Sequence, residues 1–319
     1  MLGCERPWCG FLQVQLWSHP SIGALLSLMS NKQPASRLSS AISFVRKVAF
    51  RADTSLIEPR WLTAVADVLH PCTDQAVLMK ALRFFRAASK VPLAEHLPAW
   101  HSAVFRLVPL LVPTQQLPAA SGGSRCSNAS TASVAARSTV SEEALAVLLN
   151  LSEHAAFKNA LYASGSLQPL LSLLSAPSKA TRISAACILS QMSDVGLGRE
   201  ALCQEASLLT LLRALQSTAC VEVSIGLLYV LNQLTAYKQT VKGVLRQCGT
   251  VPMLLKLLKR TCDEDALLGI VQLLELLGVA SPAQSVGEAK GLLAGACGNG
   301  LTSACASDIT VFVGNVCRV

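Results

Sequence analysis

The sequence predicts an all-α fold in which helical units of roughly forty residues stack side by side as an α-solenoid. Three observations lead to this prediction. The chain has 319 residues, of which 51% are hydrophobic and only 14% charged, so it has ample apolar material for an extended core. Two different amphipathic helix patterns recur with the same spacing. Both patterns also keep their phase across one long interruption, which stacked repeats tolerate because loop-closure entropy grows slowly with loop length.

The first helix pattern places apolar residues at i, i+3, i+4 and i+7, which form one face of a helix. An extra apolar position in most copies widens that face, as expected for a helix that is buried on two sides. The intervals between successive copies are 40, 42, 63, 41 and 43 residues, and the copies begin at Ile22, Leu62, Val104, Leu167, Leu208 and Val251.

The second helix pattern alternates with the first and starts on a small or apolar residue. Its intervals are 40, 63, 41, 42, 42 and 40 residues, and its copies begin at Ala41, Ala81, Ala144, Ala185, Leu227, Gly269 and Ile309. Because two independent patterns share one period, the sequence predicts about six to seven paired-helix units in a single solenoid that spans residues 1–319.

Two segments depart from the period. The long interval coincides with residues 113–140, which are rich in Ser, Ala and Gly and are expected to form a flexible insertion within one repeat. This insertion is not a domain boundary, since the period resumes in phase after it. Residues 281–308 are rich in Gly and Ala and match the patterns poorly, so they are expected to be a degenerate part of the solenoid.

A short additional helix is expected between units in the second half of the chain. The three candidates begin near Phe157, Arg199 and Val241. Gly165 and Gly249 follow two of them and suit the left-handed position that ends a helix. The predicted unit is therefore a short first helix, a longer second helix, a turn and a long third helix.

These units resemble a known repeat family. Residues 159–174 (NALYASGSLQPLLSLL) followed by 185–193 (AACILSQMS) are similar to an armadillo (ARM) repeat, and residues 144–152 (ALAVLLNLS) are similar to the end of another. The resemblance is strongest over 141–280, whereas the units over 20–112 are more HEAT-like. It implies a right-handed superhelix whose third helices line a concave groove that binds extended segments of other proteins. It therefore implies a non-catalytic protein-interaction scaffold.

Candidate binding residues follow from the second pattern. One position, two residues after the third apolar residue, faces away from the core and is polar in six of seven copies: Lys47, Ala87, Asn150, Gln191, Gln233, Glu275 and Asn315. In ARM proteins the matching Asn bonds the backbone of a bound peptide, and a side-chain amide suits this role because it both donates and accepts hydrogen bonds. The alternative interpretation is that these residues are polar only because this face of the helix is exposed to solvent.

The position one turn earlier is expected to set specificity. It holds Ser43, Arg83, Ala146, Cys187, Tyr229 and Val271. Nuclear-import-type ARM adaptors tend to have Trp there, so recognition of basic localisation signals is not expected. Arg83 with Arg86, and Arg46 with Lys47, would make the first half of the groove positive. Residues 1–113 also carry 12 basic and 6 acidic side chains, which favours an acidic or phosphorylated partner segment. The alternative is that these arginines are ordinary solvated surface residues.

No residue pattern indicates catalysis. The five histidines lack a metal-ligand spacing, the twelve cysteines include no C-x-x-C pair, and neither a nucleophile elbow nor a phosphate loop is present. The acidic run from Asp263 to Asp265 fits the N-terminus of a helix. We therefore expect no enzyme activity, no metal, no cofactor and no small-molecule substrate.

Three expectations concern the surroundings of the chain. Nucleic acid is an unlikely partner because no basic cluster is interleaved with aromatic residues. No run of eighteen apolar residues predicts a membrane-spanning helix. Several cysteines lie inside apolar helical patterns, which suits a reducing compartment, and this together with the lack of a signal-peptide pattern favours the cytoplasm.

Two other roles fit the same sequence. The chain could be the ARM portion of a chaperone adaptor, following a tetratricopeptide region and assisting myosin or axonemal dynein assembly. It could also be an architectural subunit of a ciliary or trafficking complex. Neither end has a clear polar cap, which predicts either a fragment of a longer protein or apolar ends that dock on another chain.

Overall fold

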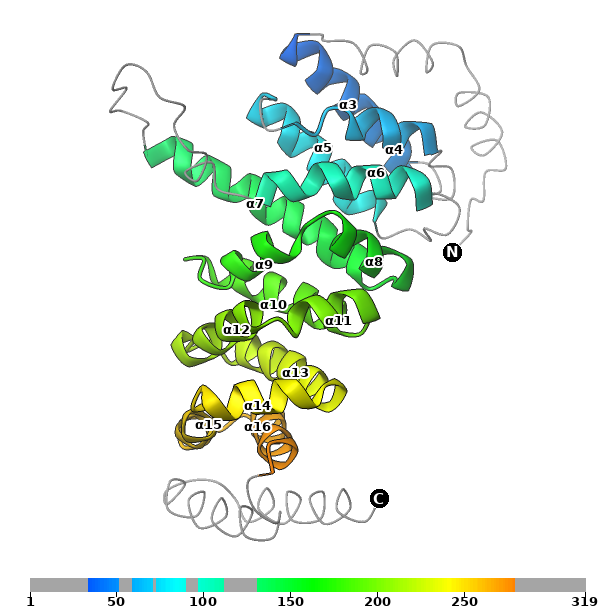
Figure 1. The fold of residues 1–319 in the computed structure, drawn as a ribbon. Coiled ribbons are helices and arrows are strands. Elements are labelled where there is room, and N and C mark those ends of the chain that lie inside the picture. The colour runs from blue at the N-terminus through cyan, green and yellow to red at the C-terminus, as the bar shows by residue number, and fades with distance from the viewer. Residues whose placement is uncertain (1–33, 52–58, 71–72, 90–96, 112–130, 279–319) are drawn as a thin grey trace, which may run out of the picture. The chain divides into compact units, whose positions relative to one another are not determined.

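The computed structural model describes residues 34–51, 59–70, 73–89, 97–111 and 131–278. Within these ranges every regular element is a helix and no strand occurs, which confirms the all-α prediction (Figure 1). Contacts divide the chain into two compact units, residues 1–198 and 199–319, which are described separately. A single solenoid over residues 1–319 stays a prediction.

In the first unit the copies of the second sequence pattern form a layer of third helices. Each contacts the next in the series, and they are α3 (Ala35–Arg51), α5 (Gln75–Ala88), α7 (Thr131–Ser152) and α10 (Lys179–Ser193) (Figure 1). The four apolar positions of the pattern are buried in α7, as Ala144, Val147, Leu148 and Leu151. The pattern therefore marks the stripe that packs in the core.

The described copies of the first pattern form a second layer in the same unit, whereas the copy that begins at Ile22 lies outside the described residues. They are α4 (Pro59–Ala66), α6 (Leu97–Leu107) with the 3₁₀ helix η3 (Val108–Leu111), and α9 (Leu167–Leu173). The expected short first helix is α8 (Ala155–Ala163), which contacts α6, α7 and α10. It is followed by Gly165 with φ +74°, the left-handed conformation that the sequence predicted.

Aromatic side chains join the layers of the first unit. Trp100 of α6 packs edge to face on Phe85 of α5 at 5.4 Å and on Phe157 of α8 at 6.4 Å between ring centroids. All three rings are buried. Such pairs contribute about 0.5–1.5 kcal/mol beyond the area they bury, so this cluster fixes three helices of different repeats against one another.

The second unit repeats the arrangement. Helix α11 (Gly196–Leu202) runs across the boundary of the two units, and the remaining elements are α12 (Glu205–Ser217), α13 (Val221–Tyr237), α14 (Gln239–Gln247), α15 (Thr250–Leu258) and α16 (Glu264–Leu276). The third helices α13 and α16 contact each other, and so do the second helices α12 and α15. Two helix ends are set by residues that the sequence singled out. Gly249 has φ +68° before α15, and the Asp263 carboxylate accepts from the Ala266 amide at 2.9 Å at the start of α16.

Three features differ from the sequence-based expectations or lie beyond the described residues. Helix α7 begins at Thr131, so residues 131–140 are helical and the flexible insertion predicted over 113–140 is too long at its C-terminal end. Phe44 of α3 occupies an apolar position of the pattern but is 48% exposed, since α3 has a described third-helix neighbour, α5, on one side only. The segment 281–308 lies outside the described residues.

Candidate functional site: a face of the third helices

The predicted binding residues that the structure describes lie on third helices. In the first unit they are Arg83 and Arg86 on α5, Asn150 on α7 and Gln191 on α10; in the second unit they are Tyr229 and Gln233 on α13 and Glu275 on α16. We call these two groups the third-helix faces of the first and second units. Lys47 lies in α3, but its side chain is outside the described residues, as is Asn315 altogether.

The register of each third helix explains why this position is accessible. In α10 the side chains of Ala185, Ile188, Leu189 and Met192 are buried, whereas Gln191 is half-buried. The buried stripe packs towards α7 and towards α8 and α9, which all contact α10. Gln191 stands beside this stripe, where its amide keeps contact with solvent. The same register leaves Gln233 half-buried on α13.

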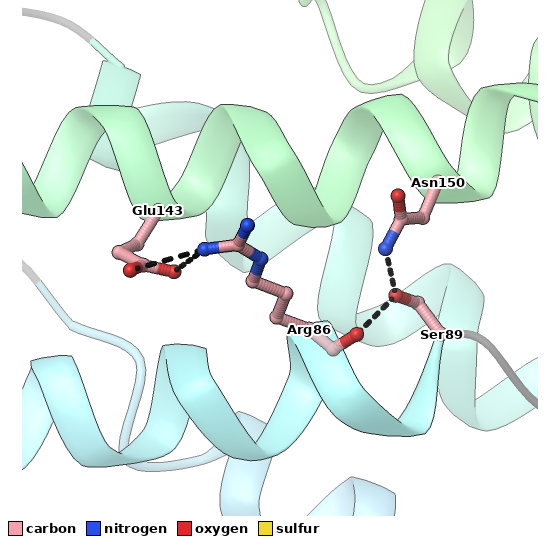
Figure 2. A network of polar contacts seen from close by, with 4 residues as sticks. All are labelled: Arg86, Ser89, Glu143 and Asn150. Atoms are coloured by element: carbon pink, nitrogen blue, oxygen red, sulfur yellow. Dashed lines mark hydrogen bonds and ion pairs between the residues drawn. The ribbon is translucent and has the colours of Figure 1, made fainter.

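Asn150 joins two third helices of the first unit. Its Nδ2 donates to Oγ of Ser89 at 2.9 Å, and Ser89 Oγ donates in turn to the carbonyl oxygen of Arg86 at 3.0 Å (Figure 2). Ser89 is the buried residue that ends α5. One donor of the Asn150 amide is therefore occupied within the chain, and this residue has a structural role beside any role in binding.

Arg86 is also engaged within the first unit. Its Nη1 lies 3.2 Å from Oε2 of Glu143 on α7, and the two side chains are 52% and 19% exposed (Figure 2). An exposed pair of this kind contributes little stability, but it neutralises Arg86 locally. Arg83 is exposed on the same helix and forms no ion pair with a described residue. Positive charge on this face therefore comes from Arg83 more than from Arg86.

Cys187 precedes Gln191 by one helical turn on α10 and is half-buried. Burial raises the pKa of its thiol above the ordinary value of 9.0, so the thiol is neutral at physiological pH. At the position where import adaptors tend to place Trp, this repeat therefore presents a small, weakly polar group.

The third-helix face of the second unit has a different chemistry. Tyr229 is 44% exposed on α13, one turn before Gln233, and Glu275 is exposed on α16. The neighbouring Asn232 donates from Nδ2 to the carbonyl oxygen of Gly269 at 3.0 Å and so links α13 to α16. A Cβ at Gly269 would lie 3.1 Å from Cβ of Leu228, which shows how closely the two helices approach.

Sequence reasoning missed the residues that hold these faces together. Four residues each contact a neighbouring third helix, yet none occupies a predicted binding position: Ser89, Glu143, Asn232 and Gly269. A signal was available for Glu143, because its charge is opposite to that of Arg86 and it lies one residue before the pattern of the next repeat. Ser89 and Gly269 carry no comparable signal.

Two features are absent from the part of the chain that the structure describes, a cluster of metal-ligand side chains and a helix able to span a membrane. No group of three or more His, Cys, Asp or Glu side chains is placed there to hold a metal ion. In the same residues no helix combines the length and the apolar character that crossing a bilayer requires.

Comparison with solved structures identifies the fold. A computationally designed armadillo repeat protein for modular peptide recognition is 19% identical, with a TM-score of 0.61 over 79% of this chain and 98% of that protein. A designed armadillo repeat protein in complex with the peptide (KR)4 is 19% identical, with a TM-score of 0.58 over 80% of this chain and 98% of that protein. Neither protein-family profiles nor characterised protein sequences match the chain. The protein thus has an armadillo-repeat-like fold of the all-α solenoid class, as the resemblance implied.

Proposed function

We propose that this protein is a non-catalytic scaffold that binds an extended segment of another protein along its third-helix faces. The observation that carries the proposal is the common register of Asn150, Gln191 and Gln233. Each lies on the same position of a third helix and remains accessible beside a fully buried stripe. An armadillo-repeat-like fold supports it, since one structural neighbour was designed for modular peptide recognition.

The chemistry of the two faces suits backbone recognition. Gln191 and Gln233 present amides that can donate to a peptide carbonyl and accept from a peptide N–H, whatever the peptide sequence. Asn150 contributes less, because one of its donors is held by Ser89. Gln191 and Gln233 are therefore the principal backbone-binding residues of the proposal, and Asn315 would extend the series.

Side-chain specificity would come from the flanking positions. Arg83 offers a guanidinium for a carboxylate or a phosphate, and Tyr229 offers an exposed ring with a hydroxyl group. We therefore propose an acidic or phosphorylated segment for the first unit, with Lys47 and Arg86 in supporting roles. Glu275 would select a basic or amide side chain in the second unit. A basic peptide such as the (KR)4 of the structural neighbour is not expected beside Arg83.

The decisive experiment is quantitative affinity purification with mass spectrometry, using tagged wild-type protein and the double variant Gln191→Ala/Gln233→Ala. We expect partners bound through the third-helix faces to be recovered about tenfold less by the variant, because each lost hydrogen bond removes about 0.5–1.5 kcal/mol. Equal recovery of every partner by a folded variant would overturn the proposal.

The matched control is Gln168→Ala/Gln204→Ala, which removes two exposed glutamines, one from each unit, that lie off the third helices. It should retain all partners. Phosphatase treatment of the lysate tests the finer claim: loss of the same partners indicates a phosphorylated segment, and retention indicates carboxylates. Arg83→Gln should weaken binding in either case.

The chaperone-adaptor and assembly-subunit hypotheses differ in the proteins that should co-purify with the chain. Co-purification of a heat-shock chaperone would favour the first, and a stable hetero-complex of defined mass would favour the second. Both are compatible with peptide binding on the third-helix faces.

A further inference from the structure

The second unit contains a pocket that lies away from its third helices. It is formed where the C-terminal end of α12 meets α15, and its volume is about 350 Å³. Its apolar part consists of Leu215 on α12 with Pro252, Met253 and Leu257 on α15. Leu215 is buried, whereas Met253 and Leu257 are half-buried and Pro252 is exposed. The pocket is therefore open to solvent on the side of α15.

The rest of the pocket lining consists of Gln216, Gly249 and two basic side chains. Lys256 and Arg260 both contribute to it and both are exposed. Neither forms an ion pair with any residue that the structure describes. Lys259 beside them and Arg213 on α12 are also exposed. No carboxylate lines the pocket.

The nearest acidic residues along the chain do not cancel this charge by pairing. Asp263 is engaged as the N-cap of α16, and Glu264 and Asp265 lie in the first turn of that helix, where they complement its dipole. The surface of α12 and α15 therefore combines an open apolar hollow with unneutralised positive charge.

We infer that this pocket is a second protein-binding site, for a segment that inserts one large apolar side chain beside carboxylates. The volume lies near the lower end of the range typical of ligand sites, and it suits a leucine or phenylalanine side chain better than a length of backbone. Lys256 and Arg260 would then pair with Asp or Glu residues that flank the inserted side chain. The site uses none of the residues of the third-helix faces, so it can be tested independently of the proposed function.

The first test selects binders from a random peptide phage library on the wild-type protein and scores each clone on two variants. Lys256→Glu reverses a charge in the pocket, whereas Lys259→Glu makes the same change one turn onward, outside the lining. We expect a class of clones that combine Asp or Glu with Leu, Met or Phe. These clones should lose binding about tenfold more with Lys256→Glu than with Lys259→Glu. The absence of such a class, or equal loss with both variants, would overturn the inference.

A second test locates the bound peptide. In protein labelled at the methionine methyl groups, a synthetic peptide of the selected sequence should shift the Met253 signal, assigned by Met253→Leu. It should leave the signal of the buried Met192 unchanged. The same shift must persist in Gln191→Ala/Gln233→Ala, which separates this site from the third-helix faces. If inorganic phosphate, or vesicles containing phosphatidylserine, shifted the Met253 signal equally, the ligand would be a simple anion or a membrane surface. Either result would overturn the inference of a protein segment.

Discussion

Asn150 on α7 donates a hydrogen bond to Ser89 at the end of α5, across 61 residues of sequence and 2.9 Å of space. The residue that an armadillo-type groove would use to hold a peptide is thus also a link between successive third helices. Substitution of Asn150 should therefore affect stability, and this effect has to be measured separately from the proposed effect on binding.

The link itself can be tested by a double-mutant cycle. Asn150→Ala and Ser89→Ala should each lower the free energy of unfolding by about 1 kcal/mol, because each leaves a polar partner without its hydrogen bond. The double variant should lose clearly less than the sum of the two, since both remove the same interaction. Urea unfolding followed by circular dichroism measures all four proteins. Strictly additive losses would show that the two side chains are not coupled.

Acid should weaken the second unit through Glu200. Tyr237 donates to Glu200 Oε1 at 2.7 Å, Lys238 donates to Oε2 at 3.0 Å, and Arg199 lies over the Tyr237 ring at 5.0 Å from its centroid. The hydrogen bond from Tyr237 and then that from Lys238 lower the pKa of Glu200 below its ordinary value of 4.5. The unfolded chain therefore binds a proton more readily than the folded one. The stabilisation is complete above pH 4.5 and is lost as the pH falls through the folded-state pKa.

The variant Tyr237→Phe checks this pH dependence. Without the phenol donor, the pKa of Glu200 should return towards its ordinary value. The melting temperature of the variant should therefore fall less than that of the wild type when the pH is lowered from neutral to below 4.5. Tyr162→Phe on α8 is the matched control and should leave the wild-type slope unchanged. Parallel pH profiles for wild type and Tyr237→Phe would contradict the assignment.

Two glycines, Gly243 in the middle of α14 and Gly249 just after its C-terminal end, should respond to alanine with opposite signs. Gly249 has φ +68°, so Gly249→Ala should destabilise by about 1–2 kcal/mol although the space around a new Cβ is open. Gly243 lies within α14 and also has open space around a Cβ, so Gly243→Ala should stabilise by about 0.5–1 kcal/mol. Differential scanning calorimetry of both variants decides the matter. The same sign for both would contradict the described backbone.

The aromatic cluster should carry much of the stability of the first unit. Trp100 is fully buried between Phe85 and Phe157, so Trp100→Ala should cost about 3–5 kcal/mol. Phe105→Ala removes a ring of the same helix that is 50% exposed, and it should cost far less, within about 1 kcal/mol. Chemical denaturation of both variants gives the comparison, and similar losses would show that Trp100 is not a core residue.

The stacking of the helices could be predicted from the sequence because burial imposes a period. The apolar positions of the third-helix pattern in α7 and α10 are buried where the spacing placed them, and Gly165 and Gly249 have the predicted left-handed backbone. The start of α7 could not be predicted in the same way. Residues 131–140 are rich in Ser, Ala and Thr and give no apolar stripe, yet alanine-rich sequence still favours a helix.

The polar contacts of the site could not be derived from the sequence alone, although the opposite charges of Arg86 and Glu143 were a signal. Arg86 and Glu143 are 57 residues apart, and their pairing depends on the side-by-side position of α5 and α7. A repeat pattern predicts which helices are neighbours but not the rotation of each about its axis. The positive surface expected from Arg83 and Arg86 together is therefore reduced to Arg83, and the amide of Asn150 is shared with Ser89.

The most direct test of the central claim is site-specific photo-crosslinking of a partner peptide. Benzoylphenylalanine placed at Gln191 or Gln233 on the third helices should crosslink to the peptide backbone, and mass spectrometry should assign the crosslinks to defined peptide positions. The same probe at Gln168 on α9 or Gln204 at the start of α12, both exposed, should give none. Crosslinks from Gln168 or Gln204 to this peptide, with none from Gln191 or Gln233, would show that partner binding does not use the third-helix faces.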